Sequence, residues 1–119
     1  MQESILRLKS KEFAKQVILA CREMRVKRIE AALTNQLLRS GTYVGANIYE
    51  AQFAQSTKDF IYKLEIALKE CNESDYWLEL LNDTGSINHE KYSELHAKCN
   101  ELRGLLISSI TTLKNKQGA

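Results

Sequence analysis

The sequence contains no proline, and this absence sets the first constraint on the fold. Proline breaks helix interiors because it lacks a backbone donor, so a chain without it is free to be nearly all helical. Only five of the 119 residues are glycine, and no segment shows the alternation of apolar and polar residues that marks a β-strand. These absences favour an all-α fold.

Long apolar segments and cysteine pairs are also missing. No run of about 18 consecutive apolar residues exists, so we expect neither a membrane-spanning helix nor a membrane partner. The N-terminal residues lack the apolar stretch of a signal peptide, which predicts a cytoplasmic protein. Cys21, Cys71 and Cys99 are widely spaced and form no Cys-x-x-Cys pair. They indicate neither a disulfide framework nor a zinc knuckle, and we expect reduced thiols in helix cores.

The charge is small in total but uneven along the chain. The net charge is +2, and an apolar share of 44% with a charged share of 27% is typical of one soluble globular domain, residues 1–119. Residues 1–30 hold eight basic and four acidic residues, a net of +4. Residues 70–95 hold one basic and seven acidic residues, a net of −6. This asymmetry can steer a partner or let subunits associate, or it can mark two solvated faces.

Four amphipathic segments separated by short links predict four helices, at about 5–24, 26–54, 57–82 and 88–114. The third shows the pattern most clearly, because its apolar residues recur at alternating spacings of about four and three. Its serine at position 56 is a helix-capping residue, and Asn82 to Gly85 forms a helix stop. Four such helices bury their apolar stripes most simply in an antiparallel up-down-up-down four-helix bundle. The expected core residues of the four segments are Phe13, Val17, Ala20, Cys21, Met24; Val26, Ile29, Leu33, Leu37, Val44, Ile48, Ala51; Phe60, Leu64, Ala67, Cys71, Ser74, Leu78, Leu81; and Tyr92, Leu95, Cys99, Leu102, Leu106, Ile110, Leu113.

Two stretches carry a family resemblance. Residues 36–51, QLLRSGTYVGANIYEA, and residues 59–70, DFIYKLEIALKE, continuing to the Tyr76-Trp77-Leu78 run, are similar to the two signatures of the bacterial four helix bundle protein family. That family includes proteins encoded in intervening sequences of large-subunit ribosomal RNA genes. Tyr43, where the family usually has serine, and Asp75, where threonine is common, depart from the pattern.

The resemblance implies a four-helix bundle and says less about function. The family is related to the accessory protein of diversity-generating retroelements, a barrel-like homopentamer that contacts a reverse transcriptase and nucleic acid. It therefore implies a homo-oligomer, a pentamer by analogy, with nucleic acid or a nucleic-acid enzyme as a partner. A shared fold does not by itself fix a function.

Polar residues within the two signatures form a candidate network. Glu70 and Glu73 lie one turn apart and can meet Arg39 from the neighbouring antiparallel helix. Such a group can be a shared polar site or an ion-pair network that fixes helix register. The Gly41…Gly45 pair lacks the Gly-Lys-Ser/Thr of a phosphate loop, and it predicts close helix approach or a local helix break. The candidate network consists of Arg39, Asn47, Glu50, Glu70 and Glu73.

Catalytic and metal-binding patterns are missing. A di-iron bundle needs Glu-x-x-His pairs, but serine stands three residues before both His89 and His96. His96 and Cys99 supply only two metal ligands, and no serine or cysteine has a recognisable base partner. We therefore predict a non-catalytic protein without metal, cofactor or small-molecule substrate.

The first segment carries the strongest indication of nucleic-acid binding. Five basic residues fall within about 80° of one another at 100° per residue, opposite the core stripe. They can follow a phosphate backbone, although Ile18 shares their sector, and a solvated basic face is the alternative. This basic stripe consists of Arg7, Lys11, Lys15, Arg22 and Arg25.

The third segment has a second apolar face, about 160–220° from Leu64. We expect this face to form an oligomer interface, unless another part of the same chain folds over it. Its residues are Tyr62, Ile66, Trp77 and Leu80. The sequence thus predicts a self-assembling scaffold associated with nucleic acid; the alternative is a purely structural homo-oligomer or protein–protein adaptor.

Overall fold

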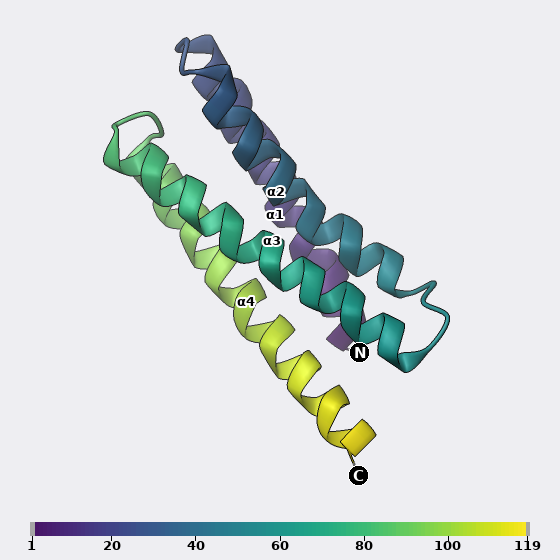
Figure 1. The fold of residues 1–119 in the computed structure, drawn as a ribbon. Coiled ribbons are helices and arrows are strands. Elements are labelled where there is room, and N and C mark those ends of the chain that lie inside the picture. The colour runs from purple at the N-terminus through teal and green to yellow at the C-terminus, as the bar shows by residue number, and fades with distance from the viewer. Residues whose placement is uncertain (1, 119) are drawn as a thin grey trace.

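The computed structural model describes residues 2–118, with side chains from Ile5 to Gly118. Four helices follow one another: α1 (Gln2–Val26), α2 (Ala31–Ala51), α3 (Thr57–Asp83) and α4 (His89–Gly118). Each helix packs against two neighbours, in the ring α1–α2–α3–α4–α1 (Figure 1). The described residues contain no strand, so the predicted all-α antiparallel four-helix bundle is confirmed.

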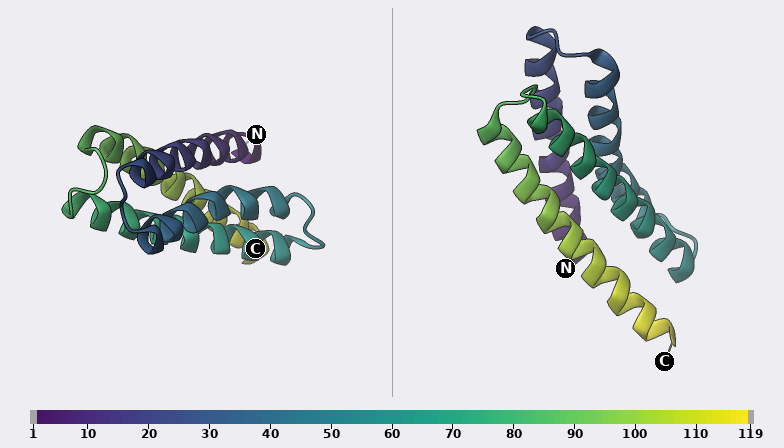
Figure 2. Two further views of the ribbon diagram at one scale, coloured as in Figure 1. Left: turned by 90° about the horizontal axis from the view of Figure 1, so that it is seen from above. Right: turned by 60° about the vertical axis from the view of Figure 1, so that its left-hand side comes forward.

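The bundle is elongated, with extents of 51 × 21 × 20 Å. Both ends of the chain and the α2–α3 connection lie at one end of the bundle, where α4 extends past its neighbours (Figure 2). The α1–α2 and α3–α4 connections lie at the opposite end. The basic start of the chain and the aromatic end of α2 are therefore at the same end.

The core follows the predicted stripes. In α3, the residues from Leu64 to Leu81 at alternating spacings are all buried, and they share one core cluster with the buried apolar residues of the other helices. Phe13 is the largest side chain that is fully buried. Phe60, Leu33, Tyr92 and Leu113 of the predicted stripes are only partly buried and pack against the core from its edge. Apolar periodicity thus places the core correctly in three of the helices.

The predicted bounds of the first two helices are wrong around Val26. This residue ends α1 instead of starting α2, and it is 83% exposed instead of contributing to the core. The chain turns from α1 into α2 at Arg28, whose backbone is left-handed with φ 63°. A hydrogen bond of 3.0 Å from the Ile29 N–H to the Met24 carbonyl closes this turn. Glycine usually supplies such a left-handed residue, and none is present here to mark the turn in the sequence. Helix α2 also ends three residues earlier than predicted, at Ala51.

The other helix ends follow their sequence signals. The Ser56 hydroxyl accepts a hydrogen bond from the Asp59 N–H at 3.0 Å, which satisfies an otherwise unpaired donor at the start of α3. Gly85 takes the left-handed conformation, φ 69°, just after α3 ends. The resulting short α3–α4 connection brings α4 back antiparallel to α3.

The two glycines of α2 mark a close approach and not a helix break. Helix α2 runs without interruption through Gly41 and Gly45. A Cβ atom at Gly41 would lie 2.9 Å from both methyl groups of Val17 on α1, and one at Gly45 would lie 3.3 Å from the Ser10 hydroxyl. Glycine is therefore needed where α1 and α2 touch.

Candidate nucleic-acid interface

The basic stripe lies on the outer surface of α1. All five of its residues, from Arg7 to Arg25, are exposed. The first and the last are 18 residue steps apart on one continuous helix, which at about 1.5 Å per step makes a stripe about 27 Å long. Helix α1 does not break before Ser10, so Arg7 stays in line with the others.

Four cations of this stripe form no ion pair with the carboxylates that the structure describes. Among the side chains that the structure describes, Lys11, Lys15, Arg22 and Arg25 meet no carboxylate within ion-pair distance. Arg25 donates a hydrogen bond of 2.8 Å to the Asn35 side chain, which is neutral. Lys9, on the other side of α1, is neutralised by Glu101 at 3.0 Å. The stripe therefore presents its positive charge to solvent.

The signature residues on α2 and α3 form an ion-pair group. Arg39 pairs with Glu73 and lies 3.6 Å from a carboxylate oxygen of Glu70, joining the two helices. Burial raises the pKa of the Glu70 carboxyl above its usual range, although the positive charge of Arg39 lowers it. Arg39 also lies over the ring of Tyr43, 5.6 Å from its centroid. This group connects α2 and α3 in a fixed register.

The other two signature residues, Asn47 and Glu50, lie about two to three turns after Arg39 on α2. Asn47 and Glu50 line a hollow of about 490 Å³ together with Glu70, Tyr43 and other α2–α3 residues. Glu50 pairs with Lys63 at 3.1 Å, and the Asn47 amide donates to the carbonyl of Tyr43. Arg39 and Glu73 do not line this hollow, so the five predicted residues are divided between an ion-pair group and a hollow, and Glu70 belongs to both.

The second apolar face of α3 is only partly exposed. Tyr62 is 59% exposed, whereas Ile66, Trp77 and Leu80 are half-buried, and Trp77 packs against the core. Tyr76, which was not among the residues predicted for this face, is 58% exposed on the same helix. The two tyrosines are therefore the most accessible large side chains of this face.

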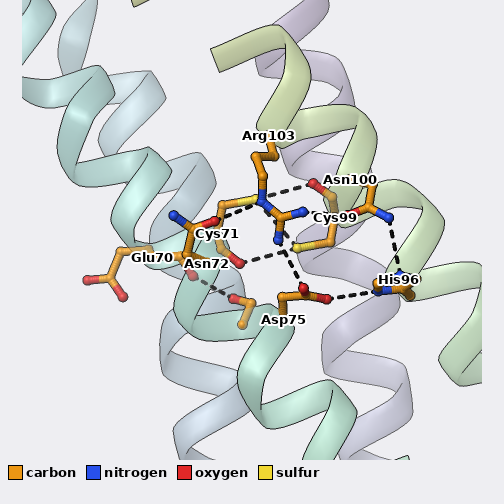
Figure 3. A network of polar contacts seen from close by, with 9 residues as sticks. Glu70, Cys71, Asn72, Asp75, His96, Cys99, Asn100 and Arg103 are labelled. Carbon is orange, nitrogen blue, oxygen red and sulfur yellow. Dashed lines mark hydrogen bonds and ion pairs between the residues drawn. The ribbon is translucent and has the colours of Figure 1, made fainter. Parts of the chain in front are cut away.

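A polar network between α3 and α4 was missed at the sequence level (Figure 3). Asp75 accepts from the His96 ring at 2.8 Å and from the Arg103 guanidinium at 3.0 Å. Arg103 also donates to the side chains of Asn72, at 2.8 Å, and Asn100. The i, i+7 spacing of His96 and Arg103 placed them on one face of α4, which was the available signal. Asp75 bonds two partners on α4 and Arg103 bonds two on α3, which suits the network to fixing the α3–α4 contact.

Two of the cysteines, Cys71 on α3 and Cys99 on α4, are buried next to this network (Figure 3). The sulfur atoms of Cys71 and Cys99 are 3.4 Å apart, and each thiol donates to the backbone carbonyl of the other residue. The hydrogen bond with Cys71, together with burial, raises the pKa of the Cys99 thiol. Cys21 is buried on α1, and burial raises the pKa of its thiol to about 11. Buried thiols that hold their protons are weak nucleophiles.

The described residues show the features of neither a metal site nor a membrane-spanning helix. Among the described side chains, from Ile5 to Gly118, no group of three or more His, Cys, Asp or Glu residues has the arrangement of a metal site. None of the described helices is long and apolar enough to cross a membrane.

The fold and the exposed basic face define the chain as a four-helix-bundle protein whose first helix carries a basic stripe. The chain belongs to the family of 23S rRNA-intervening sequence proteins, which it matches over residues 2–108. The resemblance noted in the two signature stretches is thereby confirmed. None of the curated proteins matches the chain.

A solved structure supports the same assignment. It is the 1.70 Å crystal structure of a protein of unknown function from the S23 ribosomal protein family of Bacteroides thetaiotaomicron. The two chains are 45% identical, and the superposition covers 93% of this chain and 99% of that one with a TM-score of 0.90. The family and the fold are therefore shown, and neither supplies an activity.

Proposed function

We propose that this protein is a non-catalytic, self-assembling scaffold that binds nucleic acid through the basic stripe of α1. The observation that carries the proposal is the lack of acidic partners around Lys11, Lys15, Arg22 and Arg25 among the described side chains. Lys63 and Lys114, by contrast, are paired with carboxylates. Lys58, Lys69 and Lys116 are also exposed, but they are divided between α3 and α4 and do not form a row along one helix. A row of uncompensated cations attracts phosphates and releases their counterions on binding.

Self-assembly is the second part of the proposal. The family resemblance implies a homopentamer, and the exposed tyrosines of α3 supply a surface suited to association, because interfaces are enriched in aromatic residues. Tyr62→Glu with Tyr76→Glu should yield smaller particles in light scattering while the helical circular dichroism signal stays the same. Particles of unchanged mass would show that α3 does not hold the subunits together.

Binding to short RNA and DNA, followed by fluorescence anisotropy at low salt, tests the nucleic-acid part. Replacing Lys15, Arg22 and Arg25 with glutamine should weaken binding to every sequence alike. For duplex DNA it should also reduce the slope of log K against log salt by about 2 to 3, since each phosphate contact contributes about 0.9.

A variant with glutamine at Lys58, Lys69 and Lys116 is the matched control. These lysines are exposed on α3 and α4, and replacing them changes the net charge by the same amount. Equal losses in both variants would mean that only the overall charge matters. No binding at low salt would overturn the nucleic-acid role and leave the purely structural oligomer, or an adaptor for a protein such as a reverse transcriptase.

A further inference from the structure

A groove runs along the outer surface between α1 and α2. Its volume is about 630 Å³, within the range of sites that hold small organic groups. Small residues from both helices line it, because α1 and α2 approach closely where Gly45 meets Ser10. Larger side chains stand at its sides: Arg7, Leu8 and Lys11 from α1, and Thr42 and Tyr49 from α2.

The charged residues that line the groove are all basic. Arg7 and Lys11 are the charged groups among the residues that line it, and both belong to the basic stripe. The hollow between α2 and α3 is the opposite case, since Glu50 and Glu70 line it. Charge complementarity therefore favours an anionic occupant in the α1–α2 groove.

An exposed aromatic ladder, made of Arg7, Tyr49 and Phe53, stands at the end of this groove. The guanidinium carbon of Arg7 lies 5.6 Å from the centroid of the Tyr49 ring, and the Tyr49 and Phe53 rings are 5.5 Å apart. Tyr49 is 53% exposed and Phe53 70% exposed. Exposed rings beside an arginine are the arrangement on which nucleobases stack, and each base stacked in this way contributes substantially to binding.

We propose that the α1–α2 groove binds a single strand of nucleic acid, with bases stacked on the aromatic ladder and phosphates along Arg7, Lys11 and the rest of the basic stripe. This inference rests on the proposed nucleic-acid function and names its substrate class. In a duplex the bases stack on one another, so their faces are not available to Tyr49 or Phe53. In a single strand they are available, whatever the sequence.

A stacking test separates this ladder from the basic stripe. Tyr49→Ala should weaken binding to a fluorescein-labelled oligothymidylate of about 20 nucleotides by about tenfold or more, and should change duplex binding less than twofold. Tyr49→Phe keeps the ring and should bind as the parent does. Tyr43→Ala is the matched control, because Tyr43 is also an exposed α2 tyrosine with an arginine 5.6 Å from its ring, but lies beside the acidic hollow.

A second measurement changes the strand and leaves its number of phosphates the same. A strand with the same number of phosphates but with abasic sugars should bind about tenfold or more weakly than oligothymidylate, and Tyr49→Ala should not weaken it further. Equal binding of the abasic strand, or equal effects of Tyr49→Ala and Tyr43→Ala, would overturn the proposal that bases stack in the groove. Phosphate binding by the basic stripe would not be affected. No binding of either strand or duplex at low salt would overturn the proposed function together with the groove.

Discussion

The α1–α2 contact and the α3–α4 contact hold their helices together in different ways. Between α1 and α2 the described side chains form no ion pair, and small residues let the backbones approach. Between α3 and α4 the helices are linked by the Asp75 network, by a pair between Glu65 and Lys114, and by the two cysteines. A contact made by close packing leaves the nearby cations without acidic partners. The basic stripe is a consequence of how α1 is packed as well as of its composition.

The largest effect is expected from breaking the polar contact. Asp75→Ala removes the acceptor for both His96 and Arg103, and leaves the half-buried guanidinium without its carboxylate. We expect the free energy of unfolding to fall by about 3 kcal/mol, as measured by urea denaturation. Glu65→Ala breaks the more exposed pair with Lys114 in the same contact and should cost less than about 1 kcal/mol. Equal costs would mean that the network does not hold α3 to α4.

The next effect concerns the α1–α2 contact at alkaline pH. The Cys21 thiol is buried and donates to the Thr34 carbonyl of α2, and its pKa rises from 9.0 to about 11. Above pH 9 the unfolded chain loses this proton while the folded chain keeps it, so stability falls as the pH rises toward 11. Two pKa units correspond to about 2.7 kcal/mol.

Comparison with Cys21→Ala isolates this contribution. The stability difference between the parent and the variant should stay constant below pH 9 and should then shift against the parent by about 2 to 3 kcal/mol up to pH 11. A difference that does not change with pH would show that Cys21 ionises equally easily in the folded and unfolded chains.

The smallest effects are expected from two glycine-to-alanine substitutions, which should change the free energy of unfolding in opposite directions. Gly41→Ala forces a methyl group against Val17, and should lower the unfolding free energy by about 1 to 2 kcal/mol despite the better helix propensity of alanine. Gly104→Ala, in α4, meets nothing within 4 Å and should raise it by up to about 1 kcal/mol. Adding Val17→Ala to Gly41→Ala tests the steric cause, since the second substitution should then cost less than it does alone. Stabilisation by Gly41→Ala would contradict the close approach.

The sequence predicted the parts of the fold that depend on periodicity. Buried residues of α3 such as Leu64 and Cys71 follow a heptad spacing, and the caps at Ser56 and Gly85 use side chains with a clear local role. The predicted position of the α1–α2 turn was wrong because Arg28 adopts a left-handed backbone conformation, which an arginine in a sequence does not indicate. Local patterns reveal helices, but a turn imposed by packing leaves no such pattern.

The candidate site could be predicted only in part. The basic stripe is visible on a helical wheel because all of its residues lie on α1. The groove and its aromatic ladder join Arg7 to Tyr49 and Phe53, which are more than 40 residues away in the sequence, and only the pairing of α1 with α2 brings them together. The Asp75 network was missed for the same reason, since its members come from two helices.

The chain also carries its own spectroscopic reporter. Trp77 is the single tryptophan, and its indole nitrogen is buried without a hydrogen-bond partner among the described residues. Its ring meets that of Tyr76 edge-on, at 5.0 Å between centroids, beside the exposed face of α3. An indole held in such apolar surroundings emits at shorter wavelength than one in water. The colour of the native fluorescence therefore reports the integrity of α3 without any added label.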